Sequence, residues 1–178
     1  MRYFTIGHKL RGILSDVGER KQKFIGSFNN VVANGYFMSE ECIVEVLVKQ
    51  CIPVLMYAAG MWAMNVEEIR RVGVCLNRSV RKIFNYRDFE SVKDVMYGFY
   101  ILPADLAIIR ANMLLIGACL KSNRKAVVAC AEWQREREIF VQRLVDFGVN
   151  YRLDRASVND RVWHKFSAIV EWVHDFIE

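Results

Sequence analysis

The sequence predicts a soluble, all-α protein that forms a compact multi-helix bundle and has the length of a single domain. The 178 residues include only 10 Gly and 2 Pro, which are few turn-forming residues for a many-stranded sheet. Apolar residues make up 53% of the chain, enough to form a substantial core. They also recur every three or four residues along most of its length, the spacing of one helix face.

The first half of the chain has clear helix starts and stops. Residues 1–12 are mixed in character and are expected to be a short extended piece that ends at glycines. Residues 16–34 have helical spacing, and Gly35 is the expected stop. Ser39 is the expected N-cap of the next helix. Pro53 lies inside that helix, so either two helices meet there or one helix kinks.

The second half continues in the same way. Asn65 and Glu68 have the three-residue separation of a capping box at the start of a helix. Pro103 suits the first position of another, strongly apolar helix, which is expected to be central and mostly buried. The expected helices of this half cover residues 65–84, 91–98, 103–120, 123–147 (as one helix or two) and 157–176.

The pattern of charged residues changes after Ser122, which suggests a division of the chain. Charges alternate in sign over residues 134–138, as on a solvated helix face. We therefore expect a helical region over residues 1–122 and a C-terminal helical extension over residues 123–178 that packs on it.

The helix over residues 65–84 carries the most informative charge pattern. At 100° per residue its apolar residues fall on one side, and Arg71, Arg78 and Lys82 form a stripe on the opposite side. Arg70 and Arg81 lie in the adjacent stripe, and Arg87 follows the helix. Guanidinium groups at successive turns suit backbone phosphates, because each can donate two parallel hydrogen bonds. The alternative is a solvated face. The candidate nucleic-acid-binding residues are Arg70, Arg71, Arg78, Arg81, Lys82 and Arg87.

Signatures of catalysis, cofactor binding and metal binding are missing from the sequence. It has no Walker loop, no G-x-S-x-G, no H-E-x-x-H and no paired aspartates of the kind that metal-dependent phosphoryl transfer needs. The three histidines have no ligand spacing, and the five cysteines form no zinc pattern. We expect buried free thiols in a reducing intracellular compartment, no cofactor, and no catalytic activity. The expected free cysteines are Cys42, Cys51, Cys75, Cys119 and Cys130.

No apolar run is long enough to span a bilayer, so no membrane partner is expected. The longest such run, residues 52–64, is interrupted by Pro53 and Gly60.

Residues 13–110 resemble the region that follows the palm in reverse transcriptases of non-LTR (LINE-like) retrotransposons. The resemblance rests on the run Cys51-Ile-Pro-Val-Leu-Met-Tyr57, on Trp62, and on the Arg81-Lys82 pair. The other matching positions are Ser39, Glu41, Leu47, Asn77 and Phe84. In that family this region forms the thumb and its approach. The resemblance therefore implies a thumb that grips a nucleic-acid duplex, without the palm that carries the catalytic aspartates.

Two functions follow as expectations. In the first, the chain is a non-catalytic, thumb-like fragment or remnant of a retroelement reverse transcriptase that grips the backbone of an RNA, DNA or hybrid duplex through the basic helix face. In the second, a recruited structural subunit packs against protein or RNA in a larger assembly, and the chain is a complete small protein. Exposed Trp or Phe on the last helix, from the set Trp163, Trp172 and Phe176, would favour the second function. A smooth polar tail together with one deep basic groove would favour the first.

Overall fold

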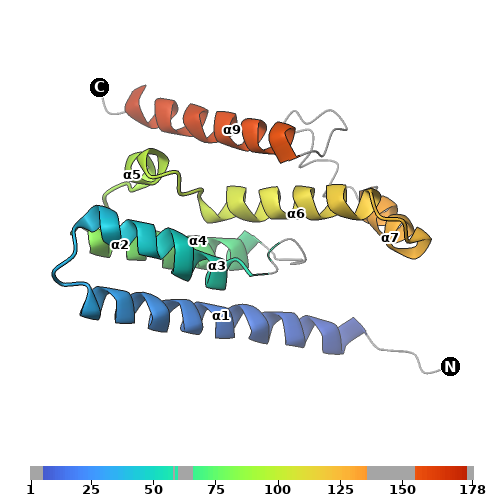
Figure 1. Cartoon of the computed structure of the whole chain (residues 1–178), viewed down its shortest axis with the longest axis horizontal. Helices are drawn as coiled ribbons and strands as arrows, with labels where there is room; N and C mark the ends of the chain where they lie inside the picture. Colours follow the sequence, from blue (N-terminus) through green and yellow to red (C-terminus); the bar gives the residue numbers. More distant parts are fainter. Residues whose placement is uncertain (1–5, 58, 60–65, 136–154, 176–178) are drawn as a thin grey trace. The chain divides into compact units, whose positions relative to one another are not determined.

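The computed structural model describes residues 6–57, 59, 66–135 and 155–175 (Figure 1). These residues form helices and connecting turns, with no β-strand among them, so the all-α prediction is confirmed for this part of the chain. They divide into two compact units. Residues 6–57 and 66–92 form unit 1, and residues 59, 93–135 and 155–175 form unit 2.

The first helix of unit 1, α1 (Ile6–Asn34), begins earlier than predicted. The expected extended conformation is wrong over residues 6–12, and residues 1–5 lie outside the described part. A glycine inside a helix costs only about 1 kcal/mol relative to alanine, which is too little to stop a 29-residue helix. Gly35 does end α1: its N–H donates to the Val31 carbonyl at 2.8 Å. A Cβ at this position would lie 2.7 Å from that oxygen.

The next helical segment runs without a break past Pro53. Helix α2 (Glu40–Val46) begins at the predicted N-cap, where Ser39 Oγ accepts a hydrogen bond from the Cys42 N–H at 3.4 Å. A π-helical turn (Leu47–Cys51) follows, and α3 (Ile52–Leu55) continues from it. The wider turn lies just before Pro53, which has no N–H to donate. Of the two expected outcomes, the structure has one helical segment with a local irregularity.

Helix α4 (Val66–Ile83) agrees with the predicted basic helix, although the expected N-cap Asn65 lies outside the described residues. It ends at Asn85, whose φ of 54° is left-handed. The Tyr86 N–H donates to the Arg81 carbonyl at 2.9 Å, the long hydrogen bond of a Schellman cap.

The core of unit 1 lies where α1 packs against α2, α3 and α4. Phe24 and Phe28 of α1 stack with their ring centroids 6.2 Å apart. Other buried side chains of this core include Val44, Leu47, Leu55, Val72, Leu76 and Val80. Since α4 buries its apolar side in this core, its opposite side is left for charge.

Unit 2 contains α5 (Lys93–Gly98), α6 (Ala104–Leu120), α7 (Lys125–Arg135) and α9 (Arg155–Asp175). As expected, α6 is largely buried, and it packs against α7 and α9. Pro103, the expected first helical residue, is instead its N-cap, because the helix begins one residue later at Ala104. The expected helical residues 136–147 lie outside the described part. The core side chains include Met96, Ile108, Met113, Val158, Val162 and Phe166.

The expected division at residue 122 falls inside unit 2, between α6 and α7. Because α6 packs on both α7 and α9, the compact units separate at residues 92 and 93 instead. The sign alternation over residues 134–138, which suggested the expected boundary, carries no information about packing.

The free thiols are partly as expected. Cys51 and Cys75 are buried, but Cys42 is exposed and Cys119 is half-buried. Cys42 lies in the first turn of α2, on the side away from the buried Val44. The side chain of Cys130 lies outside the described part.

Candidate nucleic-acid interface

A groove in unit 1 runs between α1 and α4 and has a volume of about 270 Å³. We call it the α1–α4 groove. Its lining includes four cations and no carboxylate. The lining residues are Lys21, Ile25, Phe28 and Asn29 from α1, and Arg71, Val74, Cys75, Arg78, Ser79 and Lys82 from α4.

Helical spacing explains why these residues share one groove. Arg71, Arg78 and Lys82 are separated by seven and four residues, so they lie along one stripe of α4. Lys21 and Ile25 are four residues apart on α1 and form the facing wall. Packing of the two helices in the core of unit 1 therefore brings a basic stripe opposite a further lysine.

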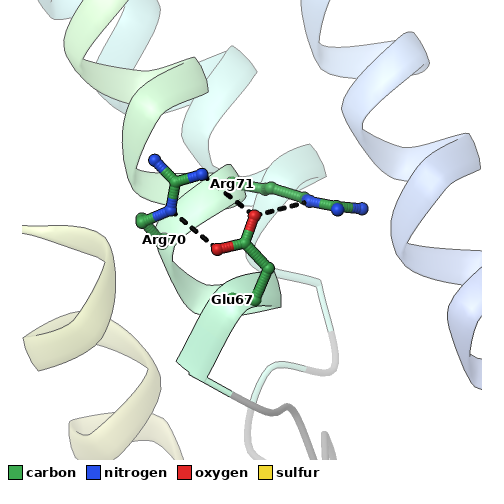
Figure 2. Close-up of polar contacts among 3 residues, drawn as sticks. All are labelled: Glu67, Arg70 and Arg71. Carbon is green, nitrogen blue, oxygen red and sulfur yellow. Dashed lines mark hydrogen bonds and ion pairs between the residues drawn. The ribbon is translucent and has the colours of Figure 1, made fainter.

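The first turn of α4 holds a three-residue charge cluster (Figure 2). The Glu67 carboxylate accepts hydrogen bonds from Arg70 Nε at 2.8 Å and Arg70 Nη2 at 3.0 Å, and from Arg71 Nε at 3.1 Å. These hydrogen bonds, first from Arg70 and then from Arg71, lower the pKa of Glu67 to about 2. Figure 2 shows the two guanidinium groups extending to opposite sides of the carboxylate. Only Arg71 reaches the groove.

Lys21 and Arg78 supply charge to the middle of the groove. Within the described part of the chain, neither side chain makes a hydrogen bond or an ion pair. Both act on the thiol of Cys75: burial raises its pKa, and the charges of Lys21 and Arg78 oppose that rise. Both cations line the groove, Lys21 from α1 and Arg78 from α4.

Lys82 bridges the two walls. Its Nζ donates to Asn29 Oδ1 at 3.1 Å and lies 5.8 Å from the centroid of the Phe28 ring. An ammonium group has three N–H donors, so an anion in the groove can still receive one.

Arg81 and Arg87 have other roles. Arg81 donates twice to the Glu90 carbonyl, from Nε at 3.1 Å and from Nη2 at 2.9 Å, and so holds the loop after α4 against its last turn. In that loop the Arg87 N–H donates to Glu90 Oε2 at 2.6 Å, and its guanidinium lies 6.0 Å from the centroid of the exposed Phe89 ring.

The six predicted binding residues thus separate into two groups. Arg71, Arg78 and Lys82, the stripe recognised in the sequence, line the groove, whereas Arg70, Arg81 and Arg87 do not. Lys21, Ile25 and Asn29 were missed. Their spacing fits one helix face, but which face of α1 meets α4 depends on tertiary packing.

Trp163 and Phe166 are the aromatic residues of the last helix whose side chains the structure describes. In unit 2 the half-buried Trp163 has its ring centroid 5.6 Å from that of Tyr100, 6.3 Å from Tyr97 and 5.9 Å from the buried Phe166. The side chains of Trp172 and Phe176 lie outside the described residues.

Comparisons of the chain with protein-family models, curated proteins and solved structures give no match. Among the described residues, no three His, Cys, Asp or Glu side chains are grouped so that they could hold a metal ion. No helix in that part of the chain has the length and apolar character needed to cross a membrane. Physical features of the α1–α4 groove are therefore the basis for any functional assignment.

Proposed function

We propose that this chain is a non-catalytic, thumb-like nucleic-acid-binding protein or fragment that holds the sugar-phosphate backbone in the α1–α4 groove. The observation that carries the proposal is the groove lining, which includes four cations from two facing helices and no carboxylate. Phosphate contacts of this kind give affinity with little base specificity and strong sensitivity to salt. The resemblance to retroelement thumbs agrees with a backbone ligand.

The arrangement of the cations favours phosphate over general solvation. Two cations of the same helices that lie outside the groove are paired with carboxylates: Lys23 with Glu19 at 2.6 Å, and Arg70 with Glu67 at 2.8 Å. Lys21 and Arg78 instead face one space without such a partner in the described part of the chain. An anion that enters there would be contacted from both walls.

The test is equilibrium binding of the full chain to labelled RNA and DNA over a salt series, with variants that separate the groove from net charge. Lys21→Ala combined with Arg78→Ala removes one cation from each wall. The matched control, Lys23→Ala combined with Arg70→Ala, removes the same charge from the same two helices, outside the groove.

We expect salt-sensitive binding by the wild type, a loss of ten-fold or more in the groove variant, and a much smaller loss in the control. Equal losses of affinity in the groove variant and the control would show that binding depends on net charge, and the groove would no longer be part of the proposal. No binding at low salt would overturn the proposed function. Arg81 is excluded from the variants because its two hydrogen bonds to Glu90 are structural.

A structural subunit of a larger assembly is the second candidate. The observation in its favour is the pair Tyr36 and Phe37 in the turn between α1 and α2, which pack edge to face with centroids 5.4 Å apart while both remain exposed. Under this proposal, the wild-type chain in native extract elutes in a complex larger than its own 20.8 kDa, and Tyr36→Ser with Phe37→Ser releases it. Elution of the wild type as the free chain would eliminate this candidate.

A further inference from the structure

We infer that the ligand of the α1–α4 groove is a single strand, whose backbone lies between the two helices and whose unpaired bases stack on Tyr86 and Phe89. This inference rests on the proposed function and names the kind of nucleic acid that the groove accepts. Three features of unit 1 carry it: the two-sided groove, its apolar wall residues, and exposed aromatic rings in the loop that follows α4.

The groove has cations on both sides. Lys21 lines the groove from α1, and Arg71, Arg78 and Lys82 line it from α4, so one strand lying in the groove can be contacted by cations from both sides.

Apolar atoms lie between these cations. Ile25 on α1 and Val74 on α4 line the groove and keep 43% and 36% of their surface exposed. Such side chains offer contact to a base face, a surface that a single strand can present and a duplex largely conceals within its stack.

Exposed aromatic rings lie in the loop that follows α4, the helix that forms one wall of the groove. Lys82 lines the groove in the last turn of α4, and the next segment of chain is bound to that turn. The Tyr86 N–H donates to the Arg81 carbonyl, and Arg81 donates to the Glu90 carbonyl. Tyr86 and Phe89 keep 39% and 80% of their surface exposed. A basic groove followed by exposed aromatic rings is the arrangement that holds single-stranded nucleic acid.

The experiment compares affinities of the full chain for one labelled sequence as single-stranded RNA, single-stranded DNA and a blunt duplex. Three variants accompany the wild type. Phe89→Ala removes the most exposed ring of the loop, and Phe89→Trp keeps a stacking surface. The control Phe37→Ala removes a similarly exposed phenylalanine from the turn after α1.

We expect single strands to bind at least ten-fold more tightly than the duplex. Phe89→Ala should weaken single-strand binding on the order of five-fold or more, as loss of one stacked base does, while Phe89→Trp and Phe37→Ala keep wild-type affinity. Single strands should also quench the tryptophan fluorescence of the Phe89→Trp variant more than that of the wild type, which would give direct support for stacking.

Two results would overturn the inference without touching the proposed function. One is that the duplex binds as tightly as the single strand, while the variant with Lys21→Ala and Arg78→Ala still has a reduced affinity. The other is an equal effect of Phe89→Ala and Phe37→Ala. Absence of binding to every ligand would instead remove the proposed function, and this inference with it.

Discussion

At the scale of single residues, five arginines in one short stretch have different environments. Arg70 and Arg71 share the Glu67 carboxylate, Arg78 has no partner in the described part of the chain, Arg81 holds a loop carbonyl, and Arg87 lies over an aromatic ring. Their chemistry is the same, so their neighbours decide which of them are available to a ligand.

Arg81 should contribute to stability. Arg81→Ala removes two charge-assisted hydrogen bonds to the part-buried Glu90 carbonyl, and we expect unfolding to become easier by about 1.5–3 kcal/mol. Arg81→Lys should recover only part of this, because an ammonium group cannot form the same two-pronged contact. Chemical denaturation measures both. Arg78→Ala is the control and should change stability by less than about 0.5 kcal/mol; equal effects of the two alanine variants would refute the structural role.

Glu67 should titrate far below an ordinary glutamate. Hydrogen bonds from Arg70 and Arg71 lower its pKa to about 2, so the folded chain keeps this carboxylate ionised at about pH 3. A lowered folded-state pKa adds stability above the unfolded value of about 4.3, and this stability is lost as the pH falls towards about 2. NMR titration of the Glu67 side chain measures the midpoint. Arg70→Ala with Arg71→Ala should move it towards 4.5; a wild-type midpoint already near 4.5 would contradict the cluster.

At the scale of elements, the end of α4 positions the aromatic loop. Asn85 adopts a φ of 54°, which disfavours side chains branched at Cβ. We expect Asn85→Gly to preserve or slightly raise stability, and Asn85→Val to lower it by about 1–2 kcal/mol, as measured by thermal unfolding. If Asn85→Val were as stable as Asn85→Gly, the left-handed cap would be wrong.

Sequence reasoning succeeded where helical periodicity was sufficient. The stripe of Arg71, Arg78 and Lys82 follows from spacing within one helix, and so does the Ser39 cap. Spacing within a helix cannot show that Lys21 of α1 faces this stripe, because that contact depends on how two distant segments pack. Spacing also could not show that Arg81 lies outside the groove, because its partner is a loop carbonyl nine positions away.

The start of α1 shows a different limit. Gly7 and Gly12 suggested an extended piece, but each weakens a helix only slightly, and the length of α1 outweighs them. The division of the chain likewise depends on how α6 packs against α7 and α9, which the sequence pattern does not contain.

At the scale of the whole molecule, the net charge of +5 is modest, so salt dependence should reflect the groove more than the overall charge. Contacts of its four cations to three or four phosphates of a single strand predict a slope of about −2 to −3 for the logarithm of affinity against the logarithm of salt concentration. Lys21→Ala should make the slope shallower by about 0.7, whereas Lys23→Ala should leave it unchanged. Equal changes of the slope in both variants would indicate that the salt dependence comes from the overall charge of the protein and not from the groove.

The most direct test of the central claim is a methyl NMR titration of the full chain with a short single-stranded oligonucleotide. Ile25 and Val74 are the exposed aliphatic residues of the two groove walls. If the groove holds the backbone, their methyl signals shift together, with one saturation curve, and neither shifts in the Lys21→Ala and Arg78→Ala variant. Saturable shifts confined to residues elsewhere, with both of these methyl signals unmoved, would contradict the assignment of the α1–α4 groove as the binding site.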